Sequence, residues 1–293
     1  MEDLVTPRQV AKAIDVSESS VKRWCDRGII PSVKTAGGHR RIPISSVMTY
    51  LRSTSQPLVS PEVLGLPAAV GRTAWVLTRA RDEVVKALLA GDESKTRQIL
   101  FDLWLGGRSV ALIGDDVIAP AFEKNGEGWS CSEVDIYQER RAIEIMLRIL
   151  FELRLGTPPG DPGKLAIGGT TSGDNYSLPT TLVEVVLQAA GWTARSMGNS
   201  VPPQSFATAI EHTRPRLFWL SVSASQSADE FLHGLSLIEQ ACLATGTKLV
   251  VGGAGSMALR DRFSPAVHVC GNMVELSQLA THLADELSPP PAA

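Results

Sequence analysis

Basic and hydroxyl side chains gather near the start of the chain, with residue types suited to contact with a polyanion. Arg and Lys bind phosphates, and Ser and Thr hydroxyls reach phosphates or base edges. A Gly37-Gly38 pair among them lets bare backbone approach a phosphate closely. The pattern predicts a DNA-binding surface, with a solvated basic face on a protein-interaction module as the alternative. Its residues are Ser19, Ser20, Lys22, Arg23, Thr35, Gly38, His39, Arg40 and Arg41.

Charge is divided unevenly along the 293 residues. Residues 1–56 contain nine Lys and Arg against five Asp and Glu, a net of +4, whereas residues 57–293 contain 19 against 26, a net of −7. A small basic segment joined to an acidic remainder indicates that only the first segment meets nucleic acid.

Residues that could perform catalysis or hold a metal are scattered. None of the five histidines lies between residues 40 and 211, and the four cysteines include no CxxC pair. The run Gly252–Gly255 is not followed by the Lys-Ser/Thr of a phosphate loop, and Gly168-Gly169 does not fit GxGxxG. We therefore expect no metal site and no enzymatic activity.

The chain contains no apolar run near the roughly 20 residues of a membrane span. Its first residues lack the basic-then-apolar layout of a signal peptide. We expect a cytoplasmic protein without a membrane partner, and the length suggests two or three domains.

Local patterns in residues 1–54 predict a winged helix-turn-helix domain. Thr6 and Ser17 suit the capping positions of two short helices, and Gly28 suits the end of the second. Two short strands then flank the Gly37-Gly38 turn, and a closing helix covers residues 44–51.

The middle of the chain predicts a linker and a bundle. Residues 55–72 are rich in Ser and Pro, which is typical of a linker. Residues 73–157 then follow the helical period, and short connections favour an antiparallel four-helix bundle. The expected helices cover 73–90, 93–105, 109–123 and 133–155.

Residues 158–293 alternate strand-like and helix-like runs, which predicts a flavodoxin-like α/β domain with a doubly wound parallel sheet. Such sheets bind ligands at the carboxyl ends of the strands, where the strand order reverses. The expected strands are 165–167, 193–196, 217–222, 248–251 and 267–269, with helices at 180–190, 203–213, 228–245 and 273–286.

The run SSVKRWCDRGIIPSVKTAGGHRRI (residues 19–42) resembles the DNA-binding domain of the MerR family. The order of head, bundle and sheet resembles the cobalamin-dependent photoreceptor repressors of the CarH and LitR type. This resemblance implies a transcriptional regulator that binds double-stranded promoter DNA as a homodimer or tetramer. It also implies that a small-molecule chromophore or light controls assembly and promoter binding.

The resemblance also implies a ligand site in the bundle and the sheet. Asp174 matches the family's Asp-x-His-x-x-Gly loop, in which Tyr176 replaces the cobalt-binding His. Ser221 and Ser223 match the family's third-strand motif, and Gly252 and Gly253 match its fourth-strand motif. These small residues either make room for a nucleotide-like tail or mark close packing. In the bundle, a Trp and a Glu keep the family spacing, and Arg140 replaces a His. The implied ligand residues are Trp129, Glu139, Arg140, Asp174, Tyr176, Ser221, Ser223, Gly252 and Gly253.

The missing histidines leave three outcomes open. Imidazole is a good neutral cobalt ligand, whereas the phenol of Tyr176 must first lose a proton, with an ordinary pKa of about 10. In the first, cobalamin, as adenosylcobalamin, binds without a protein ligand to its cobalt. In the second, a different planar or tailed ligand binds, and Arg140 and Arg141 suit a carboxylate or phosphate on it. In the third, the fold binds no ligand and serves assembly alone. Corrinoid-dependent methyltransferases share the bundle and sheet and are the nearest enzymatic alternative.

Overall fold

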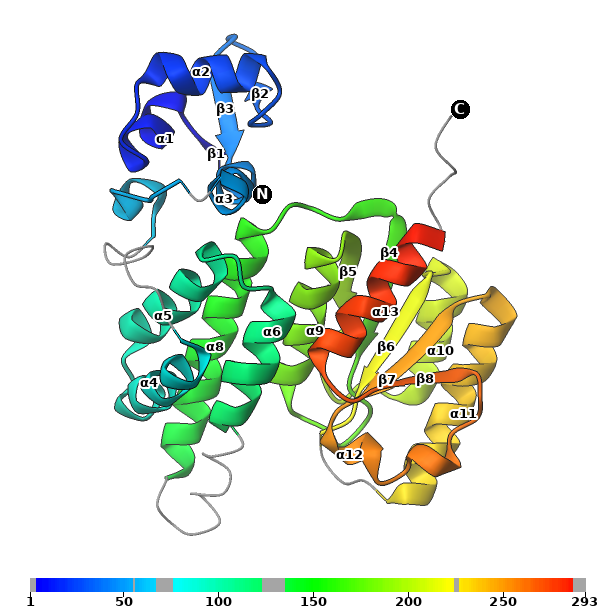
Figure 1. The fold of residues 1–293 in the computed structure, drawn as a ribbon. Helices are drawn as coiled ribbons and strands as arrows, with labels where there is room; N and C mark the ends of the chain where they lie inside the picture. Colours follow the sequence, from blue (N-terminus) through cyan, green and yellow to red (C-terminus); the bar gives the residue numbers. More distant parts are fainter. Residues whose placement is uncertain (1–3, 55, 67–75, 123–134, 224–226, 287–293) are drawn as a thin grey trace. The chain divides into compact units, whose positions relative to one another are not determined.

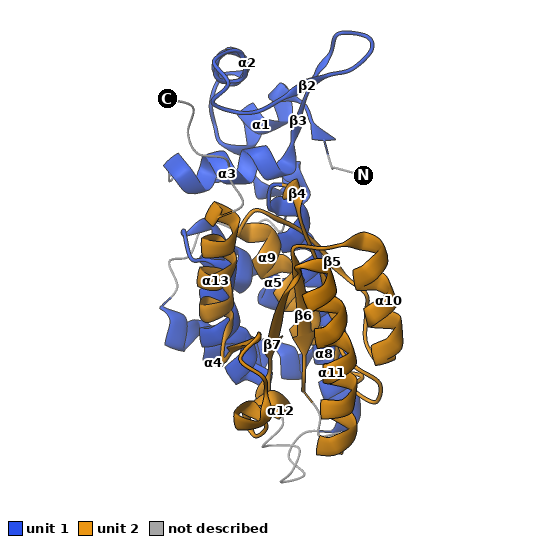
Figure 2. Ribbon diagram, turned by 90° about the vertical axis from the view of Figure 1, so that its right-hand side faces the viewer, with its two compact units in different colours: residues 1–158 blue, residues 159–293 orange. Residues whose placement is uncertain are grey.

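The structure, a computed structural model, describes residues 4–54, 56–66, 76–122, 135–223 and 227–286 (Figure 1). The chain divides into two compact units, residues 1–158 and residues 159–293 (Figure 2). In the ranges described, no helix has both the length and the apolar character to cross a membrane.

The first unit begins with the predicted helix-turn-helix. Thr6 forms a capping box at the start of α1 (Pro7–Ala13), and the Ser17 hydroxyl caps α2 (Glu18–Asp26). Both side chains accept backbone N–H groups that a helix start otherwise leaves without a partner. Gly28, at φ +71°, follows the end of α2 in a conformation that glycine adopts without strain.

The predicted wing is also present. Strand β2 (Val33–Lys34) pairs antiparallel with β3 (Arg40–Pro43), and the closing helix α3 spans Ile44–Thr54. Strand β1 (Leu4–Val5) pairs with the other edge of β3. Two residues are too short to show an alternating pattern, so β1 was not expected from the sequence.

Part of the segment predicted as a linker is folded. Residues 56–66 include a 3-10 turn, η1 (Pro61–Leu64), and both Leu58 and Leu64 are buried. The Val59 and Ser60 backbone N–H groups donate to Ala13 O in α1, at 2.8 and 3.0 Å. This part of the expected linker is therefore folded against the head. The Ser- and Pro-rich composition concealed the apolar contacts that fix this segment.

The predicted bundle helices are all present within the described ranges. They are α4 (Leu77–Ala90), α5 (Glu93–Leu105), α6 (Val110–Ile113) with the π-helical turn η2 (Gly114–Ile118), and α8 (Ile136–Gly156). The turn between α4 and α5 contains Gly91, at φ +74°. A Cβ there would lie 2.6 Å from Cζ of Arg141, so the absence of a side chain lets α8 brace the end of α4.

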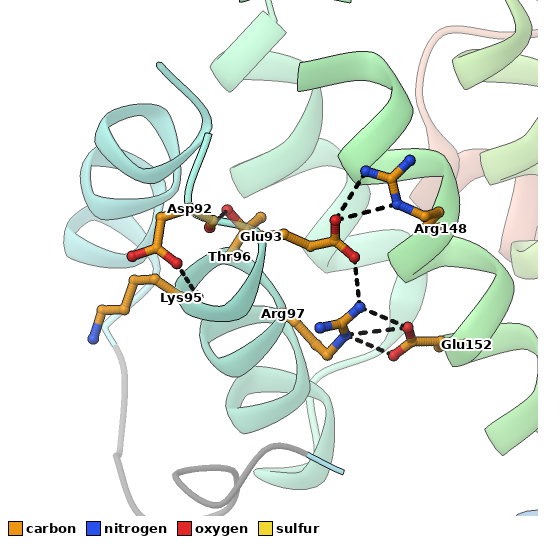
Figure 3. Close-up of polar contacts among 7 residues, drawn as sticks. All are labelled: Asp92, Glu93, Lys95, Thr96, Arg97, Arg148 and Glu152. Carbon is orange, nitrogen blue, oxygen red and sulfur yellow. Dashed lines mark hydrogen bonds and ion pairs between the residues drawn. The ribbon is translucent and has the colours of Figure 1, made fainter. Parts of the chain in front are cut away.

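Four charged side chains join α5 to α8 (Figure 3). Arg97 contacts both carboxylate oxygens of Glu152, and it also donates to Glu93 at 2.7 Å. Arg148 donates to the other oxygen of Glu93 at 2.8 and 3.2 Å. Forked guanidinium–carboxylate contacts of this kind fix the lateral register of two helices as well as adding attraction.

The second unit is a doubly wound parallel sheet, as predicted. Its strand order is β5-β4-β6-β7-β8, so the order reverses at β4. Helices α9 (Ser177–Ala189) and α13 (Met273–Glu286) cover one face, and α10 (Pro203–Thr213) and α11 (Ala228–Thr245) cover the other (Figure 1). The strands are β4 (Asp161–Gly169), β5 (Trp192–Ser196), β6 (Leu217–Ser221), β7 (Lys248–Gly252) and β8 (Val267–Cys270).

Both faces of the sheet are apolar, as a sheet between two helical layers requires. Phe206, Phe218 and Phe231 belong to a core between the sheet and helices α10 and α11. On the other face, the indole N–H of Trp192 donates to Ala280 O in α13, at 3.0 Å. A short helix, α12 (Ala254–Met257), follows β7 and was not expected from the sequence.

The network between α5 and α8 makes stability depend on pH. Hydrogen bonding from Arg148 holds the pKa of Glu93 below its ordinary value, although partial burial acts in the opposite direction. A carboxyl with a lowered pKa stabilises the fold above its unfolded pKa of about 4.3, and this contribution is lost as the pH falls through the folded value.

We therefore expect Glu93→Gln to lower the free energy of unfolding by about 1 kcal/mol at pH 7. The difference from the unmodified chain should shrink toward zero in acid, below the folded pKa. Urea titrations at several pH values measure both effects. The exposed Glu62→Gln is the control, and an equal loss in the control would contradict the assignment.

Candidate DNA interface and ligand-binding edge

The outward face of α2 presents three of the nine residues predicted to contact DNA. Ser19, Lys22 and Arg23 are exposed, whereas Val21 points into the core of the head. Lys22 forms an ion pair with Glu18 at 2.8 Å, and its side chain is 55% exposed. Such exposed pairs contribute little, so Lys22 can exchange its partner for a phosphate. Ser20 is half-buried because its hydroxyl lies 2.9 Å from that of Ser17.

Thr35, Gly38 and His39 form the tip of the wing. The Thr35 N–H donates to His39 O at 2.9 Å, and the Gly38 N–H donates to Thr35 O at 2.8 Å. Gly38 has φ +76°, which explains a glycine at this place in the turn. The Thr35 hydroxyl accepts the His39 N–H at 3.2 Å and so stabilises the turn itself.

The two wing arginines have different surroundings. Arg40 donates to Lys22 O at 2.9 Å and forms an ion pair with Asp26, and its side chain is 19% exposed. Arg41 donates to Arg40 O at 3.0 Å and contacts no carboxylate in the described ranges. The sequence shows two adjacent arginines, whereas the structure anchors the first to α2.

At the carboxyl edge of the sheet, Asp174 joins the loops that follow β4 and β6. Its side chain is 1% exposed. One carboxylate oxygen accepts the Tyr176 N–H at 3.1 Å, and the other accepts the Ser223 N–H at 2.6 Å. The carboxylate therefore connects two loops at the edge where the strand order reverses, which is where such sheets bind ligands.

Two polar residues that the sequence analysis missed complete this arrangement. The Thr170 hydroxyl donates to Asp174 O at 2.6 Å and accepts the Ser200 N–H at 2.9 Å. The Ser200 hydroxyl accepts the Gly173 N–H at 3.0 Å. Thr170 directly follows the last residue of β4. A hydroxyl residue directly after an apolar strand is the signal in the sequence that could have identified it.

The serines of the third-strand motif differ in their contacts. Ser221 is the buried last residue of β6. The Ser223 hydroxyl is buried and has no hydrogen-bond partner among the described residues. A buried hydroxyl without a partner destabilises a fold by about 1–3 kcal/mol. An orphaned group at this edge fits a site whose ligand supplies the missing hydrogen bond.

Gly252 and Gly253 are explained by close packing. A Cβ on Gly253 would lie 2.4 Å from Val222 O, and one on Gly252 would lie 2.9 Å from Cys270 O. Gly253 also has φ +103°. Backbone already occupies the space beside these glycines, which favours the packing interpretation over room for a ligand tail.

Tyr176 precedes α9 and is 41% exposed. The loops at the carboxyl edge, residues 170–176, 197–202 and 252–257, contain no histidine. Throughout the described part of the chain, no group of three or more His, Cys, Asp or Glu is arranged to hold a metal ion. The edge therefore fits the polar part of a ligand, but it offers no imidazole to a cobalt ion.

The predicted bundle residues lie in the first unit. Glu139 and Arg140 are in the first turns of α8, and Arg140 is exposed. Arg141, considered for binding an anionic ligand, instead donates to Leu89 O in α4 at 2.6 Å, with its guanidinium 5.7 Å from the Tyr137 ring centroid. Arg141 therefore braces two helices. Trp129 lies outside the residues that the structure describes.

Comparisons with known proteins agree with this organisation. Residues 4–55 match the helix-turn-helix domain family. The chain is 25% identical over 203 residues to the HTH-type transcriptional repressor CarH of Myxococcus xanthus, a match that covers 68% of this chain and 66% of CarH. It is 26% identical over 104 residues to dimethylamine corrinoid protein 3 of Methanosarcina acetivorans, covering 35% of this chain and 49% of that protein.

The chain thus spans just under two thirds of CarH and about half of the corrinoid protein. Among solved structures, the monomethylamine corrinoid protein of Methanosarcina barkeri matches with a TM-score of 0.55 and 16% identity. That match covers 71% of this chain and 100% of the other, and it supports the fold. The chain is a homologue of a transcriptional repressor, with a region similar to corrinoid proteins.

The Asp174 contacts generate a stability prediction. In Asp174→Asn, one acceptor oxygen becomes an NH2 group facing a backbone N–H, so we expect the free energy of unfolding to fall by about 1–3 kcal/mol. Urea denaturation measures the change. Asp161→Asn is the control, because the Asp161 carboxylate accepts the Gly163 N–H, at 2.8 Å, on the exposed surface. Equal stability of the two variants would show that Asp174 does not clamp the loops.

Proposed function

We propose that this chain is a MerR-type transcriptional regulator that binds double-stranded promoter DNA through its head. The observation that carries the proposal is the helix-turn-helix with a basic wing, in a chain that is homologous to a repressor along 203 residues. In this proposal α2 enters the major groove, and the wing tip contacts the neighbouring phosphates. The chain has no catalytic role.

Promoter recognition requires more than one head. A single small head contacts few base pairs, and specific sites usually combine two half-sites about one helical turn apart. We therefore propose a homodimer or tetramer that places two heads on one face of the duplex. The bundle and the sheet form the assembly.

We also propose that the carboxyl edge of the sheet binds a corrinoid such as adenosylcobalamin, and that the bound state or light sets the assembly. Ser223 supports this, because its buried hydroxyl has no partner among the described residues. The cobalt of a corrinoid would supply photochemistry or ligand exchange when bound. Since the edge contains no imidazole, the protein side chains hold the periphery of the molecule, and Tyr176 stays a proposed neighbour.

A ligand-free regulator is the second candidate. Two observations favour it: the backbone fills the space beside Gly252 and Gly253, and the edge offers no histidine. In that case the sheet serves assembly alone. A corrinoid-dependent methyl-transfer protein is a more distant candidate, because a DNA-binding head has no use in that chemistry.

Ligand binding is tested by colour. The chain is mixed with adenosylcobalamin in the dark, desalted and then illuminated, and absorption spectra are recorded before and after. We expect a retained corrinoid band, and a shift under light would support a photoreceptor. A colourless protein after desalting would eliminate the corrinoid and favour the ligand-free regulator.

DNA binding is tested through its salt dependence. We expect Arg41→Ala to weaken binding to a duplex selected from a random library by the unmodified chain. The slope of log K against log salt should also fall by about 1, because one phosphate contact releases about one counterion. Arg260→Ala, the same charge change at an exposed site in the second unit, should leave the slope unaltered. An unaltered slope in Arg41→Ala would contradict the proposed contact between Arg41 and a phosphate.

A further inference from the structure

Arg40 differs from the other basic residues of the head in how it is held. It is the first residue of β3, and its partner in the wing ladder is Lys34 of β2. One end of its guanidinium donates to Lys22 O at 2.9 Å, and the other forms an ion pair with Asp26 in the last turn of α2 at 2.5 Å. The Arg40 side chain is 19% exposed, against 55% for Lys22.

These contacts join the two elements that the proposed function places on DNA. Strand β2 and the turn that follows it are exposed, so little packing of their own fixes the direction of the wing tip. The planar fork of a guanidinium has a defined geometry, which a flexible ammonium lacks. With one end on backbone and the other on a carboxylate, Arg40 fixes where the wing stands relative to α2.

We propose that Arg40 is a positioning residue for DNA binding that acts through Asp26, and that it is not a phosphate contact. This inference rests on the proposed DNA binding of the head. In the proposed function, α2 and the wing tip bind the duplex at the same time. If the protein already holds the two at the right separation, less conformational freedom is lost on binding.

Substitution of Asp26 tests the proposal, because a repulsive role and a positioning role predict opposite changes in DNA affinity. A carboxylate on a helix that enters a DNA groove repels phosphates, so on Coulomb grounds its removal should strengthen binding. If Asp26 holds Arg40 in place, its removal should weaken binding instead. We expect Asp26→Asn to bind the selected duplex roughly three- to tenfold more weakly, the range for losing one hydrogen bond of ordinary strength.

A matched control separates charge from position. Asp15→Asn removes the same charge from an exposed residue between α1 and α2, and its φ of +54° is one that Asn tolerates well. We expect this variant to bind as tightly as the unmodified chain or more tightly. Asp26→Glu keeps the carboxylate and should recover most of the affinity.

Arg40→Ala completes a double-mutant cycle. It should weaken binding at least as much as Asp26→Asn, and the double variant should bind no more weakly than Arg40→Ala, because Arg40→Ala already removes the contact to Asp26. The salt slope should stay the same in Arg40→Ala, since no phosphate contact is lost, whereas a phosphate role would lower it by about 1. A lowered slope, or an Asp26→Asn variant that binds as well as Asp15→Asn, would overturn the proposal.

Amide hydrogen exchange tests the positioning without DNA. The Thr35 and Gly38 amides, which donate within the wing turn, should exchange faster in Asp26→Asn than in Asp15→Asn. Unaltered exchange would overturn the proposal even if no duplex binds. Failure of the unmodified chain to bind any duplex at low salt would instead overturn the proposed function, so the two failures are distinguishable.

Discussion

The packing of Trp104 joins the DNA-binding head to the bundle. The ring is 1% exposed, and its edge meets Phe101 within α5 at a centroid separation of 5.9 Å. Arg52 of α3 places its guanidinium 5.1 Å from the ring centroid. A Cβ on Gly156 would lie 2.9 Å from the ring, so α8 can pass here only with a glycine. Residues from the head and from two bundle helices thus meet at one indole.

This junction is well packed but sparsely hydrogen-bonded. Burial lowers the pKa of Arg52, yet an arginine keeps its charge. The Arg52 guanidinium donates to Arg108 O at a long 3.4 Å, and its Nε and the indole N–H of Trp104 find no partner among the described residues. A cation over an aromatic face contributes about 0.5–2 kcal/mol. The polar groups of this junction therefore contribute little, and the contacts around the Trp104 ring join the head to the bundle.

The sequence predicted the features that local chemistry determines. Thr6 and Ser17 mark helix starts because their hydroxyls satisfy nearby backbone N–H groups, and the five strands of the sheet appear as apolar runs between helical segments. The contacts that it did not predict join residues far apart in the chain. Arg40 reaches Asp26, and Arg141 reaches Leu89 across 52 positions. In the sequence both look like members of basic clusters, because pattern alone does not show which arginine turns inward.

The loops at the carboxyl edge of the sheet are held in place by hydrogen bonds within the protein. Asp174 uses both carboxylate oxygens on backbone N–H groups, and Thr170 and Ser200 connect the same loops to the next one. These bonds lie within the protein, so a ligand at this edge would meet loops that are already ordered and would lose little conformational entropy on binding. The affinity for such a ligand would then depend on polar groups that these hydrogen bonds leave unused. Ser223 offers such a group in its buried hydroxyl, whereas these loops contain no histidine. The loops at this edge therefore present a hydrogen-bonding group to a ligand and no imidazole to a metal.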